Sequence, residues 1–267
     1  MSPVNCRNCG ATLGGRFCSE CGQEDRELDL SLREFVSEIL GNLVSFDSRV
    51  WRTLVPLLVR PGDLTVRYLA GQRVRFVPPV RLYLFVSILH FLLLAWLGPQ
   101  GDFTLQADAS EAGAVTVEEI QAMDVPEPLQ RILQDPAGFR RTFLQGLSYL
   151  MFFLLPAFAG LLKVVYAGRG RPHLHHLVFA VHIHAFVFIL LSVGVLLEAS
   201  GVLLLEGLAE LLSLIVPVYL FLALLRMYGG RWWTTALRTA FLSVSYGLLL
   251  ALGVAALAGF LVFVWPL

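Results

Sequence analysis

The stretch LVFAVHIHAFVFILLSVGVLL, residues 177–197, decides the fold of this chain. Apart from two histidines it carries no ionisable side chain. It supplies the roughly 20 apolar residues that a helix needs to cross a hydrocarbon core of ~30 Å. Similar stretches lie at 80–97, 143–166, 202–225 and 240–265. The sequence therefore predicts an all-α polytopic membrane protein with about five transmembrane helices.

The composition supports this class. Of the 267 residues, 57% are hydrophobic and only 15% are charged, which is too apolar for a soluble domain. The 20 basic and 20 acidic residues cancel, so no overall basic field indicates a nucleic-acid partner. The first 25 residues are polar and contain cysteine, so we expect no cleavable signal peptide.

All four cysteines of the chain precede the apolar stretches, in the two units CRNCG at 6–10 and CSECG at 18–22. Two thiolates separated by two residues can hold one side of a tetrahedral zinc ion, and the glycine permits a tight turn. The two units predict one structural zinc ion bound by Cys6, Cys9, Cys18 and Cys21 in a ribbon at 1–25. A disulfide or redox pair is the alternative. Because zinc-binding thiolates need a reducing compartment, we expect a cytoplasmic N-terminus.

Residues 26–79 predict amphipathic, interfacial helices. Apolar residues recur at helical spacing between 32 and 44, and a second helix at 49–59 ends at Pro61-Gly62. Asp63 can cap a third helix, for which Gly71 is a fitting C-terminal stop. An arginine cluster overlaps and follows it: Arg67, Arg73, Arg75 and Arg81. These helices either lie on the inner membrane surface or pack on the membrane domain at 80–267.

Basic residues predict the orientation. They gather before the first span and in the loops that follow the second and fourth spans, whereas the loop at 98–142 is acidic. Since positive charge stays cytoplasmic, we expect the N-terminus inside, the acidic loop exported and the C-terminus outside.

Ionisable residues inside the spans are the candidate functional groups. His182 and His184 lie in the third span, His90 in the first, and Glu210 in the fourth. Such groups usually face a bundle interior and find a partner there, so they indicate a possible polar cavity. The histidines either bind a second metal ion or relay protons, or they are neutral and only hydrogen-bonded.

The fifth span has small residues at every fourth position, including Gly247, Ala251, Ala255 and Gly259. Small residues at this spacing let two helix backbones approach closely. They predict a packing face, either within the bundle or across a homo-oligomer.

Residues 46–87, FDSRVWRTLVPLLVRPGDLTVRYLAGQRVRFVPPVRLYLFVS, follow a ribbon that ends in FCSECGQ. This arrangement resembles an uncharacterised bacterial membrane-protein family, catalogued as a domain of unknown function. That family has a four-cysteine ribbon before an R-T-L…P-G…Y-x-x-G-x-R…P-x-x-x-Y pattern and spanning helices. The matching residues here are Arg52, Thr53, Leu54, Pro61, Gly62, Tyr68, Gly71, Arg73, Pro79 and Tyr83. Phe76 stands where we expect tyrosine. The resemblance implies a bacterial inner membrane and brings no activity with it.

These observations favour a non-enzymatic adaptor or scaffold whose ribbon docks a cytoplasmic protein partner, since a closed metal site offers structure rather than reactivity. The alternative is a small transporter, channel or lipid-handling protein that uses the intramembrane histidines and Glu210. A metal-dependent membrane enzyme is a third possibility, but no nucleophile triad, nucleotide loop or H-E-x-x-H motif accompanies the histidines.

Overall fold

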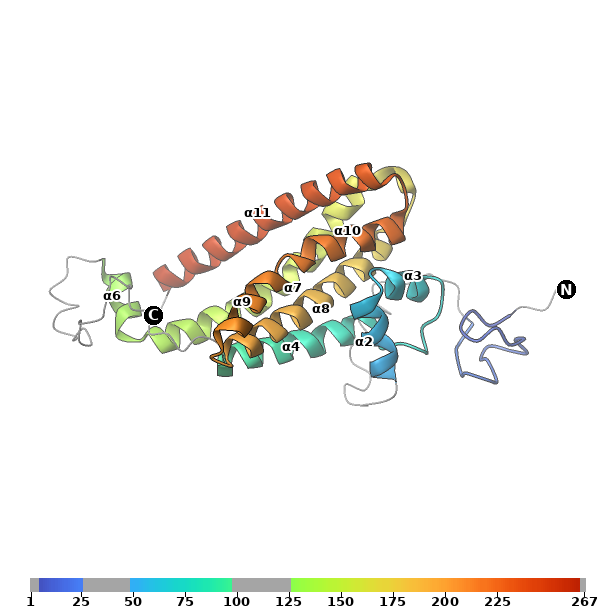
Figure 1. The fold of residues 1–267 in the computed structure, drawn as a ribbon, viewed down its shortest axis with the longest axis horizontal. Helices are drawn as coiled ribbons and strands as arrows, with labels where there is room; N and C mark the ends of the chain where they lie inside the picture. The colour runs from blue at the N-terminus through green and yellow to red at the C-terminus, as the bar shows by residue number, and fades with distance from the viewer. Residues whose placement is uncertain (1–4, 26–48, 98–125, 265–267) are drawn as a thin grey trace.

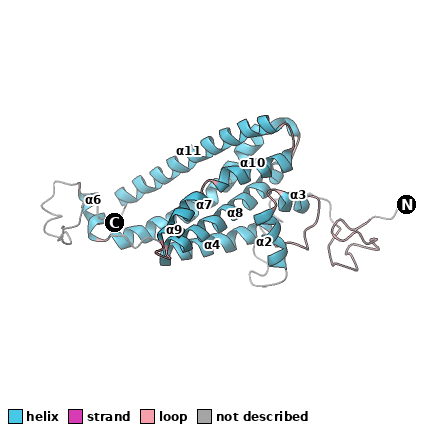
Figure 2. Cartoon of the chain, viewed as in Figure 1, coloured by secondary structure: helices cyan, strands magenta, loops and turns pink. Residues whose placement is uncertain are grey.

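A computed structural model of the chain describes residues 5–25, 49–97 and 126–264. Outside the ribbon, every regular element in this part of the chain is a helix (Figure 2). Four helices are long and apolar enough to cross a membrane. They are α4 (Pro79–Leu97), α7 (Pro136–Val165), α8 (His173–Glu198) and α11 (Trp232–Val264). The fold is therefore that of an all-α, multi-pass membrane protein.

Helix α8 forms the centre of the bundle. It contacts α4 along one side and α7 along another (Figure 1). Val178, Phe179, Ala180 and Ala185 of α8 are completely buried. A helix that is apolar around its whole circumference suits such a central position, because every face is covered by protein or lipid.

The fourth predicted span is two helices, α9 (Leu203–Leu212) and α10 (Ile215–Tyr228), so our prediction of one helix over 202–225 is wrong. Pro217 has no N–H to donate to the carbonyl of Ser213, and this disrupts the helical hydrogen bonding there. The amide of Val216 donates to Ser213 at 3.3 Å instead, in a tighter turn. Together the two helices run the length of the bundle (Figure 1).

The end of the predicted exported loop is helical. Helix α6 (Glu127–Gln134) leads into α7, which begins seven residues before the predicted start of the second span. Asp135 caps α7 by accepting a hydrogen bond from the amide of Gly138 at 2.8 Å. Residues 98–125 of the predicted loop lie outside the described residues.

Two short helices pack on one end of the bundle. Helices α2 (Arg49–Val59) and α3 (Asp63–Leu69) follow the predicted bounds closely, and Gly71 has a φ of 100° at the end of α3. Asp63 does not cap α3; its carboxylate pairs with Arg67 at 2.8 Å. Both helices contact α8, and α3 also contacts α10. The helical pattern at 32–44 lies outside the described residues.

Gly62, between α2 and α3, allows these helices to sit close to α10. Its φ is 75°, and a Cβ at this position would lie 2.8 Å from the carbonyl oxygen of Ala223. The hydroxyl of Tyr219, also on α10, donates to the carbonyl of Leu57 at the end of α2. The turn of the Pro61-Gly62 motif is therefore a contact point between the short helices and the bundle.

Helix α11 packs on α7 through glycines other than those we predict. A Cβ on Gly253 would meet Leu150 at 2.9 Å, and one on Gly146 would meet Leu257 at 2.6 Å. In contrast, Ala251 and Ala255 are exposed, and no neighbouring side chain within the described chain approaches Gly247. The predicted small face is thus not an internal packing face, and its use in a homo-oligomer remains a prediction.

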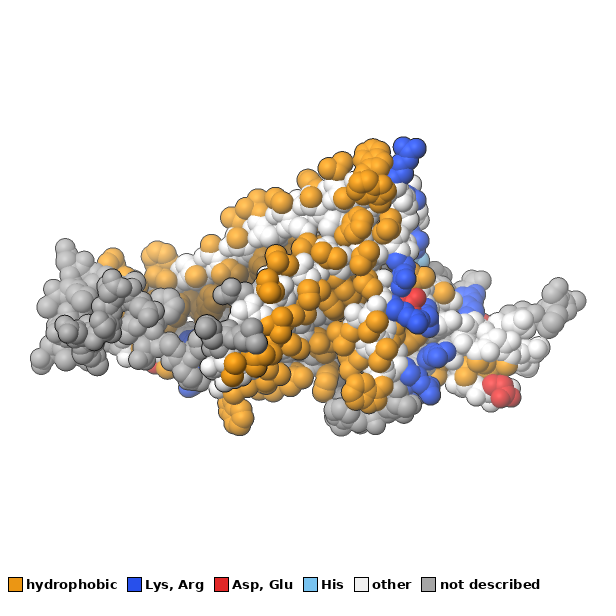
Figure 3. All heavy atoms as spheres, viewed as in Figure 1, with side chains coloured by type: hydrophobic (Ala, Val, Ile, Leu, Met, Phe, Trp, Pro, Cys, Tyr) orange, Lys and Arg blue, Asp and Glu red, His pale blue; other side chains and the backbone are white. Residues whose placement is uncertain are grey.

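The surface has two zones. Hydrophobic side chains cover the sides of the bundle, and Lys and Arg side chains gather at the end next to the ribbon (Figure 3). This arrangement matches the apolar belt and basic rim of a protein that sits in a bilayer.

Candidate metal centre and intramembrane polar groups

The ribbon consists of two equivalent turns. The amide of Gly10 donates to Cys6 at 2.8 Å, and the amide of Gly22 donates to Cys18 at 2.9 Å. Both glycines have positive φ, 80° and 70°, which explains why glycine ends each C-x-x-C unit. Each turn closes with one antiparallel bridge, Asn5 to Thr12 and Phe17 to Glu24. The second unit thus repeats the first, twelve residues later.

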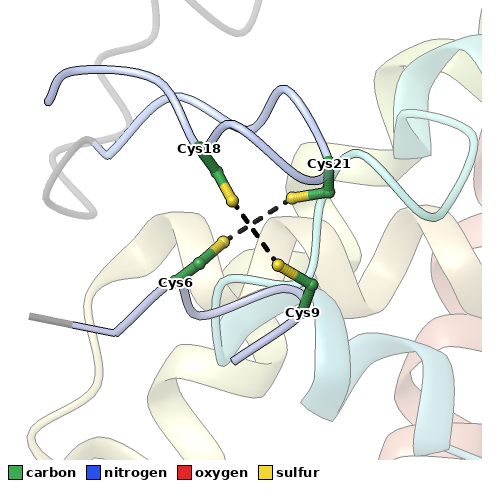
Figure 4. A group of neighbouring side chains, drawn as sticks. All are labelled: Cys6, Cys9, Cys18 and Cys21. Atoms are coloured by element: carbon green, nitrogen blue, oxygen red, sulfur yellow. Dashed lines mark hydrogen bonds between the residues drawn. The ribbon is translucent and has the colours of Figure 1, made fainter. Parts of the chain in front are cut away.

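The four cysteine sulfurs converge on one point (Figure 4). The sulfurs of Cys6 and Cys21 are 3.6 Å apart, those of Cys9 and Cys18 are 3.5 Å apart, and all four lie within 4.8 Å of one another. Sulfurs at the corners of a tetrahedron around zinc lie about 3.8 Å apart, whereas a disulfide needs about 2.05 Å. The geometry is compatible with a bound metal ion and excludes disulfides in this arrangement.

The pKa values of two of the closely spaced thiols are shifted in opposite directions. The backbone N–H of Cys9 donates toward Cys6 and lowers the pKa of that thiol to about 7. The backbone N–H of Ala11 lowers the pKa of Cys9, but the Cys18 thiol and burial outweigh it and raise this pKa to about 12. Four thiolates cannot form so close together unless a positive ion compensates their charge.

Gln23 fastens the ribbon to the helical body. Its amide nitrogen donates to the carbonyl of Gly71 at 2.7 Å. Its amide oxygen accepts from the backbone N–H of Arg73 at 3.2 Å and of Val74 at 3.4 Å. The side chain is buried, so its polar atoms depend on these partners. One glutamine therefore joins the ribbon to the Y-x-x-G-x-R motif.

Gly71, whose carbonyl binds Gln23, also leaves space for the side chain of Arg7. A Cβ at Gly71 would lie 2.9 Å from the Cδ of Arg7, whose side chain crosses the loop. The motif glycine thus both ends α3 with its positive φ and gives Arg7 of the ribbon room to pack.

His184 is a fully hydrogen-bonded residue of the bundle. Its Nδ1 lies 2.8 Å from the carbonyl of Ala180, so Nδ1 carries the proton and donates it. Its Nε2 therefore accepts from the hydroxyl of Tyr246 on α11, at 2.6 Å. Both nitrogens are used within the protein, which is the arrangement of a packing residue rather than a metal ligand.

His182 joins α8 to α3. Its Nδ1 lies 2.9 Å from the hydroxyl of Thr65, and its ring meets Tyr68 edge-on. The side chain is only 2% exposed, and its Nε2 has no partner among the described residues. His182 therefore links the third span to the short helices that carry the family-like motif.

His90 lines a cavity and is hydrogen-bonded to Ser192. The hydroxyl of Ser192 donates to the carbonyl of Phe188 at 2.7 Å, so its oxygen accepts from Nδ1–H of His90 at 3.2 Å. The neutral ring then has an unprotonated Nε2. His90 lines a cavity of about 710 Å³ between α4, α7, α8, α10 and α11.

Of the four polar residues that we predict to share a cavity, two line the same one. His90 and His184 line the same cavity, whereas His182 lies outside it, against α3. The backbone of Glu210 is in α9, and its side chain is not among those that the structure describes. The remaining lining is mainly apolar and includes Pro217 at the break between α9 and α10.

Sequence reasoning missed the partners of these residues. Gln23, Thr65 and Tyr246 each make a specific contact with a residue far away in the sequence. Only Gln23 had a visible signal, because it directly follows the second cysteine unit in FCSECGQ.

The contact between Thr65 and His182 can be tested by a double-mutant cycle. We expect Thr65→Val to lower the free energy of unfolding by about 1–3 kcal/mol, because it leaves a buried imidazole nitrogen without a partner. After His182→Leu the same change should cost much less. Denaturant unfolding of the purified chain in detergent measures this, with the more exposed Thr234→Val as the control. Additive effects of the two changes would contradict the contact.

Comparison with known proteins adds one match. Residues 47–91 match a family model described as Protein of unknown function (DUF3667). No curated protein and no solved structure matches the chain. The matched segment contains α2, α3, the loop that Gln23 binds, and α4 as far as Phe91. This segment and the four apolar helices thus fit the uncharacterised membrane-protein family that the sequence resembles.

Proposed function

We propose that this chain is a non-enzymatic membrane adaptor whose zinc ribbon docks a protein partner. The observation that supports this proposal is the combination of a four-thiol cluster with the Gln23 contact to residues 71–74. Four sulfur ligands leave no position on a zinc ion for a substrate. A ribbon that is held against the membrane body by a buried glutamine is suited to present a fixed surface.

The exposed side of the ribbon offers an anchor for such a partner. Phe17 is 58% exposed, and the guanidinium of Arg16 lies 5.6 Å from the centre of its ring. Arg16 in turn pairs with Glu24 at 2.6 Å. Aromatic residues and arginine are enriched at protein interfaces relative to the rest of the surface.

We infer that the membrane is the bacterial inner membrane and that the ribbon is cytoplasmic. Reduced thiols and the arginines at the ribbon end support this orientation. If α9 and α10 together cross once, the chain crosses five times and ends outside. We expect a C-terminal alkaline phosphatase fusion to be active and a green fluorescent fusion to be dark. The reverse pattern would place the C-terminus inside and overturn the topology of five spans with a cytoplasmic ribbon.

The adaptor role is tested by separating the surface of the ribbon from its fold. In cells, proximity labelling from the N-terminus should recover a defined neighbour that is lost with Phe17→Ser, while the zinc content stays unchanged. The matched control is the exposed Ser19→Ala, which should retain the neighbour. An identical neighbour set for wild type, Phe17→Ser and a Cys18→Ser/Cys21→Ser chain would overturn the adaptor.

A second candidate is the handling of an amphiphile within the membrane. The observation that favours it is the mainly apolar cavity of about 710 Å³, which His90 and His184 line. A lipid-exchange or flux assay in liposomes tests it, with His90→Phe as the variant. Rates equal to those of empty vesicles would leave the adaptor as the only proposal.

A further inference from the structure

A second cleft lies at the ribbon end of the molecule, outside the sites described above. It has a volume of about 470 Å³ and lies between α2, α3 and the loop before α4. Arginines line it together with apolar side chains. The lining residues that matter most here are Arg52, Arg60, Arg75, Trp51, Val55 and Val59.

Among the described residues, three of the four arginines that line the cleft have no acidic partner. A fourth lining arginine, Arg67, is paired with Asp63 at 2.8 Å, and Arg226 also lies 3.7 Å from that carboxylate. Across the described residues, Arg52, Arg60 and Arg75 have no carboxylate within ion-pair distance. Three guanidinium groups around one cleft repel one another, so a bound anion would relieve a cost that the empty cleft carries.

The other wall of the cleft is apolar and exposed. Trp51 and Val59 are each 72% exposed, and Val55 is 55% exposed. These residues are four apart on α2 and therefore form one stripe along the helix. Exposed tryptophan is typical of the level at which lipid headgroups meet acyl chains. The basic rim of the bundle lies at the same end (Figure 3).

We propose that this cleft binds an anionic phospholipid, with the phosphate held by Arg52, Arg60 and Arg75 and the acyl chains along the stripe of α2. Guanidinium groups bind phosphate oxygens through paired N–H donors. A net negative headgroup satisfies three cationic groups, whereas a zwitterionic headgroup brings its own cation into the same cleft. The apolar wall explains why the occupant is a lipid rather than a free phosphate.

The site also adjoins the ribbon. Arg52 and Arg75 line a neighbouring cleft together with Asn8, Cys9 and Cys21 of the ribbon. A headgroup at these two arginines therefore lies beside the four-thiol cluster. Arg52 and Arg75 would then contact both the lipid and the cleft next to the ribbon.

Native mass spectrometry of the full-length chain in neutral detergent tests the proposal, with phosphatidylglycerol and phosphatidylcholine added in equal amounts. We expect preferential retention of phosphatidylglycerol and about a tenfold loss of that preference in Arg52→Gln/Arg75→Gln. The control Arg231→Gln removes an exposed arginine outside the cleft and should change the preference less than about twofold. Millimolar inorganic phosphate should not displace the lipid.

Three results would overturn the proposal. They are equal retention of both lipids, an equal loss in the Arg231→Gln control, and displacement by inorganic phosphate, which would make the ligand a soluble anion. If the double variant does not fold, as its zinc content and melting curve would show, the single change Arg60→Gln, directly after α2, decides. It should reduce the preference about fivefold.

Discussion

Purified full-length protein is expected to contain one zinc ion per chain, and Cys18→Ser is expected to contain none. A serine hydroxyl is a poor zinc ligand, and the remaining three thiols do not close the tetrahedron. The described ribbon has two isolated bridges, and Cys6 and Cys18 are its only buried apolar residues, so a bound zinc ion should supply most of its folding free energy, typically about 10–16 kcal/mol in small zinc modules. Elemental analysis together with thiol titration measures the stoichiometry.

The exposed Ser19→Ala is the matched control and should retain the ion. A chelator should also release the loop at 71–74, because the unfolded ribbon no longer holds Gln23 in place. Hydrogen exchange would then increase at the amides of Arg73 and Val74, while α8 stays protected. Less than half a zinc ion per chain with four reactive thiols would contradict the metal centre.

Gly62→Ala is expected to be among the most destabilising single changes in the helical part of the chain. The new Cβ meets a φ of 75°, which costs about 1–2 kcal/mol for a residue other than glycine. It also meets the backbone oxygen of Ala223 at 2.8 Å, and such overpacking adds about 1–3 kcal/mol. The obstacle is backbone, so no side-chain rotation relieves it. Denaturant unfolding in detergent should show the combined loss.

Gly170→Ala separates these two contributions. Gly170 has a φ of 61°, but a Cβ there has no neighbour within 4 Å. We therefore expect only the conformational cost in this variant. If Gly62→Ala is no more destabilising than Gly170→Ala, then α2 and α3 do not pack on α10 as closely as described.

The elements that could be predicted are those with local signals. Pro61-Gly62 ends α2 and Gly71 ends α3, because proline and glycine act on the backbone of their own residues. The start of α7 also has such a signal in Asp135-Pro136, a capping residue before a proline at the first helical position, whereas the apolar pattern by itself points to residue 143. The break between α9 and α10 has a local signal in Pro217, but apolar content is equally high on both sides of it, so the hydropathy pattern by itself predicts one continuous span.

The four-thiol cluster could be predicted because its geometry follows from spacing alone. The hydrogen bonds of the histidines could not, because each partner lies on another element. Thr65 and His182 are separated by 117 residues, and His184 and Tyr246 by 62. The sequence shows that a histidine in a span needs a partner, but only the packing of the helices selects which one.

The two turns of the ribbon have nearly the same backbone, so by shape alone the module has two ways to sit on the body. Ala11 occupies the position in the first turn that Gln23 occupies in the second. Gln23, together with Arg7 beside Gly71, therefore determines which of the two turns faces the loop at 71–74. In an Ala11→Gln chain both turns carry a glutamine that can bind the loop at 71–74. Distances between a spin label on the ribbon and one on α3 should then show two populations.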